Sequence, residues 1–580
     1  MNNKLIGKKL LKKRIAVSME EQPAELLLKG GKIVDLCNLS FYESNIAIVG
    51  GHIAAIGEFY TSGQEIIELK GSYVTPGLID SHLHIESTLL LPPELARVIV
   101  TQGTTAIVHD PHEIANVLGI KGVNLMLEAA KGLPCDFFAT IPSCVPATDM
   151  ETSGGEIRIK EVEKLLNFAN VIALGEMMNY PGVINREFEV LEKLLISSSA
   201  GKPLDGHAPD LSGRELQAYL TSGISTDHEC ITAREAMEKL RYGMKIIIRH
   251  GSATSSLDEL LPLVTRANSS QFMFGSDDRD AGELLTQGHV NGILRAAVKI
   301  DGDPLLMLRL ATLSAANHYR LYDRGMITPG KRADLVVFED LKAFKPLVVI
   351  KDGRIVAREG KIEASIPQFT LPPFARNSVK INKTITEADF TLKYPPGRIP
   401  VIGVVPGQLV TEKLELDLPR MGNGEVSSIT ESGINKISVI ERHGKNGNIA
   451  VGLISGFDLK YGALASSVAH DSHNIIVVGA SESAMALAVN ELVRIGGGFA
   501  VVGEENQLKA LLPLEAAGLM SVDSAAQVAD EMNNILLAAG KLGTRLPQPF
   551  LTLAFMALPV IPSLKITDRG LFDVDKFTYL

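Results

Sequence analysis

The chain has 580 residues, which is too long for one hydrophobic core and indicates two to four domains. An apolar share of 46% with 21% charged residues excludes a fibre or a disordered chain, and four cysteines in no paired spacing exclude a disulfide framework. The net charge of −10 excludes a general nucleic-acid binder, which needs a basic face.

Residues 1–23 form a basic extension, which we interpret as a solvated helix end rather than a contact for membrane or nucleic acid. Two β-rich pieces, residues 24–73 and 325–375, contain short apolar runs separated by turns such as Gly30-Gly31 and Gly50-Gly51. Because these pieces flank a long middle segment, we predict that they pair into one small composite β-sandwich.

The middle segment, residues 74–324, alternates strand-like runs with amphipathic, helix-like runs. Eight βα units in roughly 250 residues predict an α/β fold of the (β/α)8 TIM-barrel type, with its chemistry at the C-terminal strand ends. An open doubly wound sheet fits worse, because one crevice would have to collect side chains from many strands. The predicted strands are Gly77–His82, Ala106–Asp110, Asp136–Ile141, Val171–Glu176, Pro203–Gly206, Gly223–Asp227, Lys245–Ile248 and Gln271–Ser276.

Residues 384–580 are predicted to form a further α+β domain, with strands such as Gly498–Val502 and helices such as Ser524–Ala539. This segment contains the cluster His470-Asp471-Ser472-His473. The cluster could hold another metal or reach over the barrel mouth. A polar turn before the next strand explains it without any function, and we prefer that interpretation.

Metal-ligating side chains follow most of the predicted barrel strands, and imidazole with carboxylate suits zinc, iron or manganese in a hydrolytic site. The HxH pair of the first strand alternates in extended chain, so both rings point the same way. Two further histidines, each ending its own strand, could hold a second ion, with one glutamate between the two metals. The predicted metal ligands are His82, His84, Glu176, His207, His228 and Asp277.

Several motifs resemble one enzyme family over nearly the whole chain. VTPGLIDSHLH (74–84) is similar to the first-strand signature of the amidohydrolase superfamily. IES (85–87), HDPHE (109–113), GEMMN (175–179), DGHAP (205–209) and LPVIPSL (558–564) resemble bacterial adenine deaminases more narrowly. The resemblance implies conversion of adenine and water to hypoxanthine and ammonia. It also implies that Glu176 bridges the metals where many superfamily members use a carboxylated lysine.

This reaction needs a base for the attacking water and an acid for ring nitrogen N1 and the leaving ammonia. We predict Asp277 as base and proton shuttle, and Glu229 as the first candidate for N1, with Glu113 and His112 behind it. The predicted substrate-binding residues are Asp278, His109 and Glu86, of which the last two could instead support the metal ligands or cap a helix.

The expected cofactors are two divalent ions, manganese or iron before zinc. Adenine is the expected substrate, and neither nucleic acid nor membrane is expected as a partner. A homo-oligomer is expected, most simply a dimer. The cytoplasm is the expected location because no leader segment is evident. Two alternatives remain: a cyclic-amide hydrolase related to dihydroorotase or hydantoinase, and a catalytically inactive barrel scaffold. Ammonia release from adenine, ring opening of a hydantoin and metal analysis distinguish the three.

Overall fold

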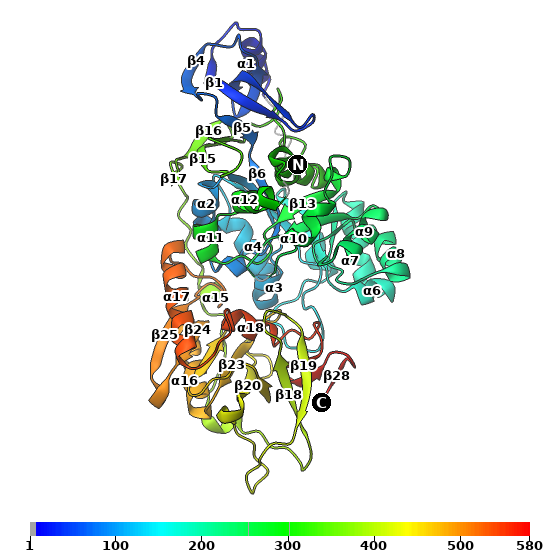
Figure 1. The fold of residues 1–580 in the computed structure, drawn as a ribbon, viewed down its shortest axis with the longest axis vertical. Coiled ribbons are helices and arrows are strands. Elements are labelled where there is room, and N and C mark those ends of the chain that lie inside the picture. The colour runs from blue at the N-terminus through cyan, green and yellow to red at the C-terminus, as the bar shows by residue number, and fades with distance from the viewer. Residues whose placement is uncertain (1–6, 253, 301) are drawn as a thin grey trace.

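The computed structural model describes residues 7–252, 254–300 and 302–580. A β-sheet built mainly from N-terminal strands lies at one end of the elongated molecule, and a C-terminal region lies at the other (Figure 1). Parallel strands and their helices occupy the middle, between these two ends. No helix in the described ranges is long and apolar enough to cross a bilayer.

The terminal sheet joins strands from both sides of the middle segment. Its central junction is the antiparallel pair of β5 (Tyr73–Pro76) and β14 (Leu335–Phe338), which are hundreds of residues apart in the chain. The pairing joins strands of both predicted pieces, 24–73 and 325–375, in one nine-stranded sheet; the sequence predicted that they form one small composite β-sandwich. The other strands are β1 (Ala24–Asp35), β2 (Ser40–Val49), β3 (His52–Ile56), β4 (Gly63–Glu68), β15 (Pro346–Lys351), β16 (Arg354–Arg358) and β17 (Lys361–Ile362).

The basic N-terminal segment forms helix α1 (Lys8–Ser18) against this sheet. Most of its cationic side chains face solvent, but Arg14 is buried and its Nη2 donates to the Gly50 carbonyl at 2.7 Å. The helix end is therefore only partly solvated.

Eight parallel strands form the middle of the molecule, and their bounds follow the predicted ones closely. Strands β6 to β10 form a five-stranded sheet and β11 to β13 a three-stranded one, so the pairing forms two sheets rather than one closed ring. Between β6 and β13, Leu83 and Asp277 form an isolated parallel bridge. Between β10 and β11, the Ser225 N–H donates to the Leu204 carbonyl at 3.0 Å. The strands are β6 (Leu78–Leu83), β7 (Thr104–His109), β8 (Asp136–Ile141), β9 (Val171–Met177), β10 (Leu204–Gly206), β11 (Thr226–Asp227), β12 (Lys245–Arg249) and β13 (Phe272–Gly275).

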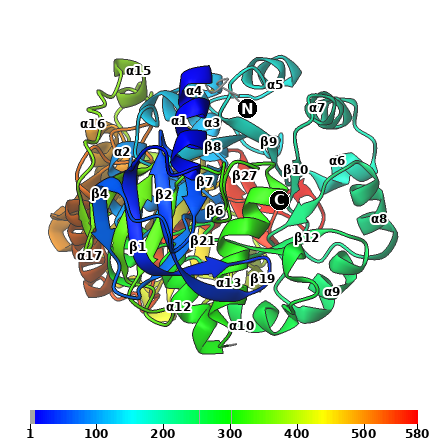
Figure 2. The same ribbon diagram turned by 90° about the horizontal axis from the view of Figure 1, so that it is seen from above.

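Helices connect these strands and lie around them (Figure 2). Their apolar faces are buried against the strands. In α2 (Pro92–Val100), for example, the buried residues Leu95, Ala96 and Ile99 recur at helical spacing. The other principal helices are α3 (His112–Leu118), α4 (Ile120–Ala129), α5 (Ile159–Leu165), α6 (Tyr180–Ile184), α7 (Phe188–Ser199), α8 (Gly213–Thr221), α9 (Ala233–Arg241), α10 (Leu257–Leu260), α11 (Ala281–Gln287), α12 (Val290–Ile300) and α13 (Pro304–Arg309).

The C-terminal region contains an eight-stranded mixed sheet with α16 (Glu482–Ile495) packed on it. The Ser481 side chain accepts from the Ala484 N–H and so caps that helix. The strands are β18 (Ile399–Val404), β19 (Thr411–Leu416), β20 (Ile434–Ile440), β21 (Ile449–Ser455), β22 (Ala463–Ser466), β23 (Ile475–Gly479), β24 (Gly498–Val502) and β25 (Leu508–Pro513). Beyond them lie α17 (Ala525–Lys541), α18 (Pro549–Phe555), β26 (Leu564–Thr567), β27 (Gly570–Asp573) and β28 (Thr578–Tyr579).

The C-terminal region is hydrogen-bonded to the long loop between β8 and α5. Thr152 is the centre of this contact: its Oγ1 donates to Asp568 at 2.7 Å, and its carbonyl accepts from Asn474 Nδ2 at 2.9 Å. Helix α17 also packs against α11. Because this loop follows the C-terminal end of a parallel strand, the hydrogen bonds to it bring the C-terminal region to the edge where the predicted ligands lie.

Candidate metal centre and active site

The six predicted metal ligands converge from five strands of the middle segment. Glu176, near the end of β9, is at their centre: its Oε1 is 3.4 Å from His84 Nε2, and its Oε2 is 2.8 Å from His207 Nδ1 and 3.1 Å from His228 Nε2. Burial alone would raise the pKa of Glu176, but the His228 and His207 rings hold it well below its usual range. The central carboxyl group is therefore ionised, as a carboxylate ligand to metal must be.

Asp277 closes the cluster on the side of the last strand. Its Oδ1 is 3.2 Å from His84 Nε2 and 3.5 Å from His82 Nε2. The backbone at Asp277 has φ of 54°, a left-handed conformation that is uncommon outside glycine and concentrates at functional sites. Asp277 lies two residues after the end of β13, and its carboxylate is next to His82, near the end of β6, and His84, which follows that strand.

The donor atoms fit metal ions in number and type. His84 Nδ1 is 3.1 Å from the Asp110 carbonyl, which places the ring proton on Nδ1 and leaves the Nε2 lone pair facing the carboxylates. His82 Nε2 is buried and has no hydrogen-bond partner in the described chain. Sets of predicted ligands whose ligand atoms lie within 4.8 Å of one another include His82, His228 and Asp277; His82, His84 and Glu176; and Glu176, His207 and His228. The cluster can hold metal.

Arg249, at the end of β12, is a site residue that the sequence analysis missed. It donates to both Glu229 oxygens, at 2.6 and 3.1 Å, and to Asp277 Oδ2 at 2.8 Å. Burial alone would raise the pKa of Asp277, but Arg249 and the neighbouring histidines hold it well below its usual range. The available signal was its position at a strand end, where a cation can orient the carboxylates that follow neighbouring strands.

A second layer of polar groups lies outside the cluster. Glu113, in the first turn of α3, is 2% exposed, and burial together with Glu86 and Asp278 raises its pKa well above the usual range. Ser87 Oγ donates to Asp278 at 2.5 Å and to Glu113 at 3.4 Å, so these two acidic residues share one hydroxyl. Glu113 and Asp278 therefore lie close to the cluster without belonging to its centre.

The remaining predicted site residues lie at different depths. His112 Nδ1 is 3.4 Å from Glu176 Oε1, which places this ring beside the central carboxylate. Glu86 accepts from the Ile114 N–H at 3.1 Å and thus caps the start of α3. Both ring nitrogens of His109 are buried without a hydrogen-bond partner in the described chain, and burial lowers its pKa to about 3. His109 is neutral and lies behind the cluster rather than in it.

The His470–His473 turn lies between β22 and β23 but reaches the barrel segment. His470 Nδ1 is 3.6 Å from Glu113 Oε1, and His473 Nε2 is 3.8 Å from Glu113 Oε2. The whole turn is buried. It thus forms part of the wall next to the cluster, a contact that the preferred interpretation of an isolated polar turn did not include.

Other histidines support the site from behind or lie at its rim. His289 Nε2 is 2.9 Å from Asp80, and His318 Nε2 is 3.1 Å from Asp205. His250, which follows β12, has its Nδ1 2.9 Å from Ser255 Oγ and is only half-buried.

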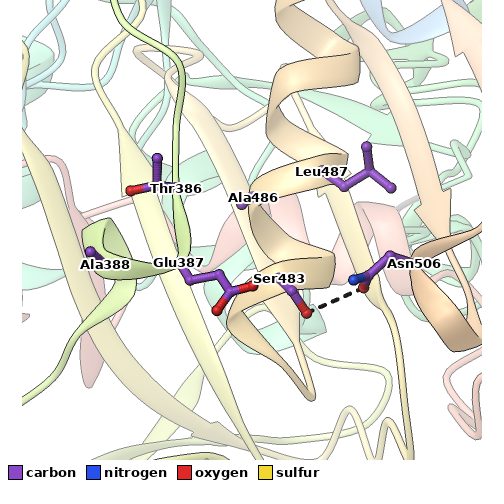
Figure 3. A pocket seen from close by; sticks show the side chains of 7 residues that line it. All are labelled: Thr386, Glu387, Ala388, Ser483, Ala486, Leu487 and Asn506. Carbon is purple, nitrogen blue, oxygen red and sulfur yellow. Dashed lines mark hydrogen bonds between the residues drawn. The ribbon is translucent and has the colours of Figure 1, made fainter.

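A separate surface hollow lies in the C-terminal region (Figure 3). Its one hydrogen bond among the residues drawn joins Ser483 Oγ to Asn506 Oδ1 at 3.3 Å. The lining residues are Thr386, Glu387, Ala388, Ser483, Ala486, Leu487 and Asn506, which include one ionisable group and no histidine. The hollow is therefore unsuited to the chemistry of the cluster.

Comparison with known proteins covers almost the whole chain. Residues 73–356 match the model of the "Amidohydrolase family", and residues 408–578 match the "Adenine deaminase C-terminal domain". "Adenine deaminase 2" of Carboxydothermus hydrogenoformans is 45% identical over 98% of this chain and 99% of that protein. "Adenine deaminase" proteins of Desulfatibacillum aliphaticivorans and Methanothrix thermoacetophila are 43% and 44% identical over 98% of each chain.

Solved structures are more distant. The beta-aspartyl dipeptidase of Fervidobacterium islandicum AW-1 has a TM-score of 0.46 at 15% identity, covering 59% of this chain and 99% of that one. The dihydropyrimidinase of Brevibacillus agri has a TM-score of 0.45 at 15% identity, covering 58% of this chain and 96% of that one. We draw no conclusion on function from likenesses at this level.

Proposed function

The chain belongs to the adenine deaminase family of the amidohydrolases, and on that premise we propose that it hydrolyses adenine to hypoxanthine and ammonia. The observation that supports this most is the likeness over nearly the full length of both chains, at 45% identity. The convergence of histidines and carboxylates from five strands agrees with it, because hydrolysis at a ring carbon needs an activated water.

We propose that two divalent ions, manganese or iron before zinc, occupy the cluster. Such ions, when bound, lower the pKa of water to about 7 and stabilise negative charge that develops on the substrate. Glu176 would bridge them, since its two oxygens face different histidines. The residues that would hold the ions are His82, His84, Glu176, His207, His228 and Asp277.

Asp277 is our candidate base for the attacking water. Its carboxylate is ionised and next to the ligand histidines, so it can accept a proton where the water must be held. Arg249 fixes its second oxygen and prevents the carboxylate from rotating away. From this position Asp277 can pass the proton on towards the leaving amino group.

For the proton at N1 the contacts favour Glu113 over Glu229, which the sequence analysis placed first. Glu229 accepts two hydrogen bonds from Arg249, and such a fork stabilises the ionised carboxylate. Glu113 has the opposite environment, since burial and the neighbouring Glu86 and Asp278 raise its pKa well above the usual range and favour the protonated form, which can donate. We therefore assign Glu113 to N1 and Glu229 to orienting Arg249, with His112 beside the reacting carbon.

Asp278 and Glu86 then have supporting roles towards the substrate. Asp278 shares Ser87 with Glu113 and can accept a hydrogen bond from the purine amino group. Glu86 adds to the effect of burial in raising the pKa of Glu113, which favours the protonated form of that carboxyl group.

We also propose that the eight parallel strands close into a (β/α)8 barrel. The bridge between Leu83 and Asp277 and the hydrogen bond from Ser225 to Leu204 support closure at the two gaps in the pairing. The matched ranges, 73–356 and 408–578, agree with a hydrolase segment followed by a separate C-terminal domain.

The direct test is an assay of protein reconstituted with Mn²⁺ against adenine, with hypoxanthine and ammonia measured as products. Equal release of both is expected. The matched substrates are a hydantoin and a dihydropyrimidine, whose ring opening would favour a cyclic-amide hydrolase instead. Failure to convert any of the three at full metal loading would leave the inactive scaffold as the better account.

A further inference from the structure

The turn from His470 to His473, here called the C-terminal turn, is built into the wall of the active site. His470 is 7% exposed and His473 is 0% exposed. Both rings face the two oxygens of Glu113, at 3.6 and 3.8 Å, although the turn is more than 350 residues away in the chain. The C-terminal region therefore contributes side chains at the place where the substrate is proposed to bind.

The ring of His470 is held in one orientation. It stacks on Phe555 of α18 with centroids 4.7 Å apart and an interplanar angle of 25°. The backbone of the turn is held as well: the His470 backbone N–H donates to the Ala554 carbonyl at 3.2 Å, and His443 Nε2 is 2.8 Å from the Ser472 carbonyl. A side chain fixed in this way is preorganised to make a directional contact.

Glu113, His470 and His473 lie close enough to hold a metal ion, but the hydrogen bonds argue against it. The Ala469 N–H donates to His473 Nδ1 at 3.2 Å, so the neutral ring carries its proton on Nε2, which faces Glu113. That nitrogen then has no lone pair for a metal. The group is arranged for hydrogen bonding instead.

Glu113 lies next to both the cluster and His470. A carboxyl oxygen of Glu113 is within 4.8 Å of ligand atoms of His84 and His112, and Oε1 is 3.6 Å from His470 Nδ1. A flat purine with C6 at the cluster and N1 at Glu113 would extend along its N1–C2–N3 edge towards His470. N3 is an acceptor, and a neutral imidazole N–H is a suitable donor.

We propose that His470 is a substrate-binding residue that donates a hydrogen bond to N3 of the purine, next to Glu113 at N1. This inference rests on the proposed function. It makes the C-terminal region part of the active site. In this arrangement Glu113 and His470 recognise the ring nitrogens N1 and N3 by one hydrogen bond each.

The test compares adenine with 3-deazaadenine, in which a C–H group replaces N3. His470→Ala should lower kcat/KM for adenine by about 10- to 100-fold, the effect of a lost buried hydrogen bond. The same substitution should change kcat/KM for 3-deazaadenine, or its inhibition constant, by less than about threefold, because the partner atom is already missing. His470→Asn keeps an N–H donor and should recover part of the loss.

The matched control is His443→Ala, which loosens the same turn without removing the His470 ring. It should affect both substrates equally. Equal losses on both substrates for His470→Ala would mean that the residue acts only through the structure of the turn, and would overturn the proposal. If the wild type turns over adenine and His470→Ala does so at the same rate, the proposal is also overturned. If the wild type does not turn over adenine, the proposed function is rejected together with this inference.

Discussion

Replacing Arg249 by methionine tests whether the cation at the end of β12 orients the catalytic carboxylates. The substitution keeps similar side-chain length but removes the hydrogen bonds to Glu229 at 2.6 and 3.1 Å and to Asp277 at 2.8 Å. Of these bonds, only the one to Asp277 orients the proposed base. A charge-assisted hydrogen bond of this kind is worth about 2–3 kcal/mol, and we take that as the loss in transition-state stabilisation. We therefore expect kcat/KM for adenine to fall about 30- to 150-fold.

The stability of Arg249→Met should fall as well, because the buried Asp277 and the partly buried Glu229 lose their cation. Breaking a buried pair costs about 3–5 kcal/mol, so the free energy of unfolding in urea should drop by about that amount. Arg249→Lys keeps the charge but cannot reach both carboxylates in a fork, and its activity should be intermediate.

Initial rates with adenine, metal content and urea unfolding should be measured on the same preparations. The matched control is Arg324→Met, which removes a buried arginine that pairs with Asp136. Asp136 begins β8 and so lies at the N-terminal end of that strand, opposite the metal cluster. That variant should lose stability but retain kcat/KM. An Arg249→Met enzyme whose kcat/KM stays within about threefold of the wild type, at full metal content, would refute the orienting role.

Other perturbations have equally definite outcomes. Asp277→Asn should abolish deamination while retaining most of the metal, and comparable turnover would remove Asp277 as the base. Glu176→Ala should lower the bound metal measured by elemental analysis, and unchanged content would show that another group bridges. Burial would raise the pKa of Asp136, but Lys351 and the arginines outweigh it and hold that pKa below its usual range. This contribution to stability is present above the unfolded pKa of about 3.9 and disappears as the pH falls through the lower folded value. Asp136→Asn should therefore cost about 2 kcal/mol at pH 7, less than a fully buried pair because Asp334 still neutralises Lys351. The gap to the wild type should close in acid, and a gap independent of pH would contradict this.

Local patterns predicted the strands well, because each parallel strand is a short apolar run between polar turns. β8 covers Asp136–Ile141 as expected, while β11 is shorter than predicted and retains only Thr226–Asp227. The ligands could be grouped from sequence because C-terminal strand ends of a parallel sheet meet at one edge.

Contacts between distant segments could not be predicted in this way. Arg249 has no motif, and its role depends on two carboxylates that follow other strands. The C-terminal turn has a conspicuous sequence, but nothing local indicates that His470 meets Glu113. The pairing of β5 with β14 in one continuous sheet likewise depends on long-range register.

The central claim is that the buried cluster around Glu176 holds metal and that this metal enables hydrolysis of adenine. Metal-stripped protein should be titrated with Mn²⁺ while hypoxanthine formation and bound metal are both measured. We predict no activity without metal, a rise to a plateau near two ions per chain, and no recovery for Glu176→Ala at any loading. Full activity in the stripped protein, or none at saturating metal, would contradict the account.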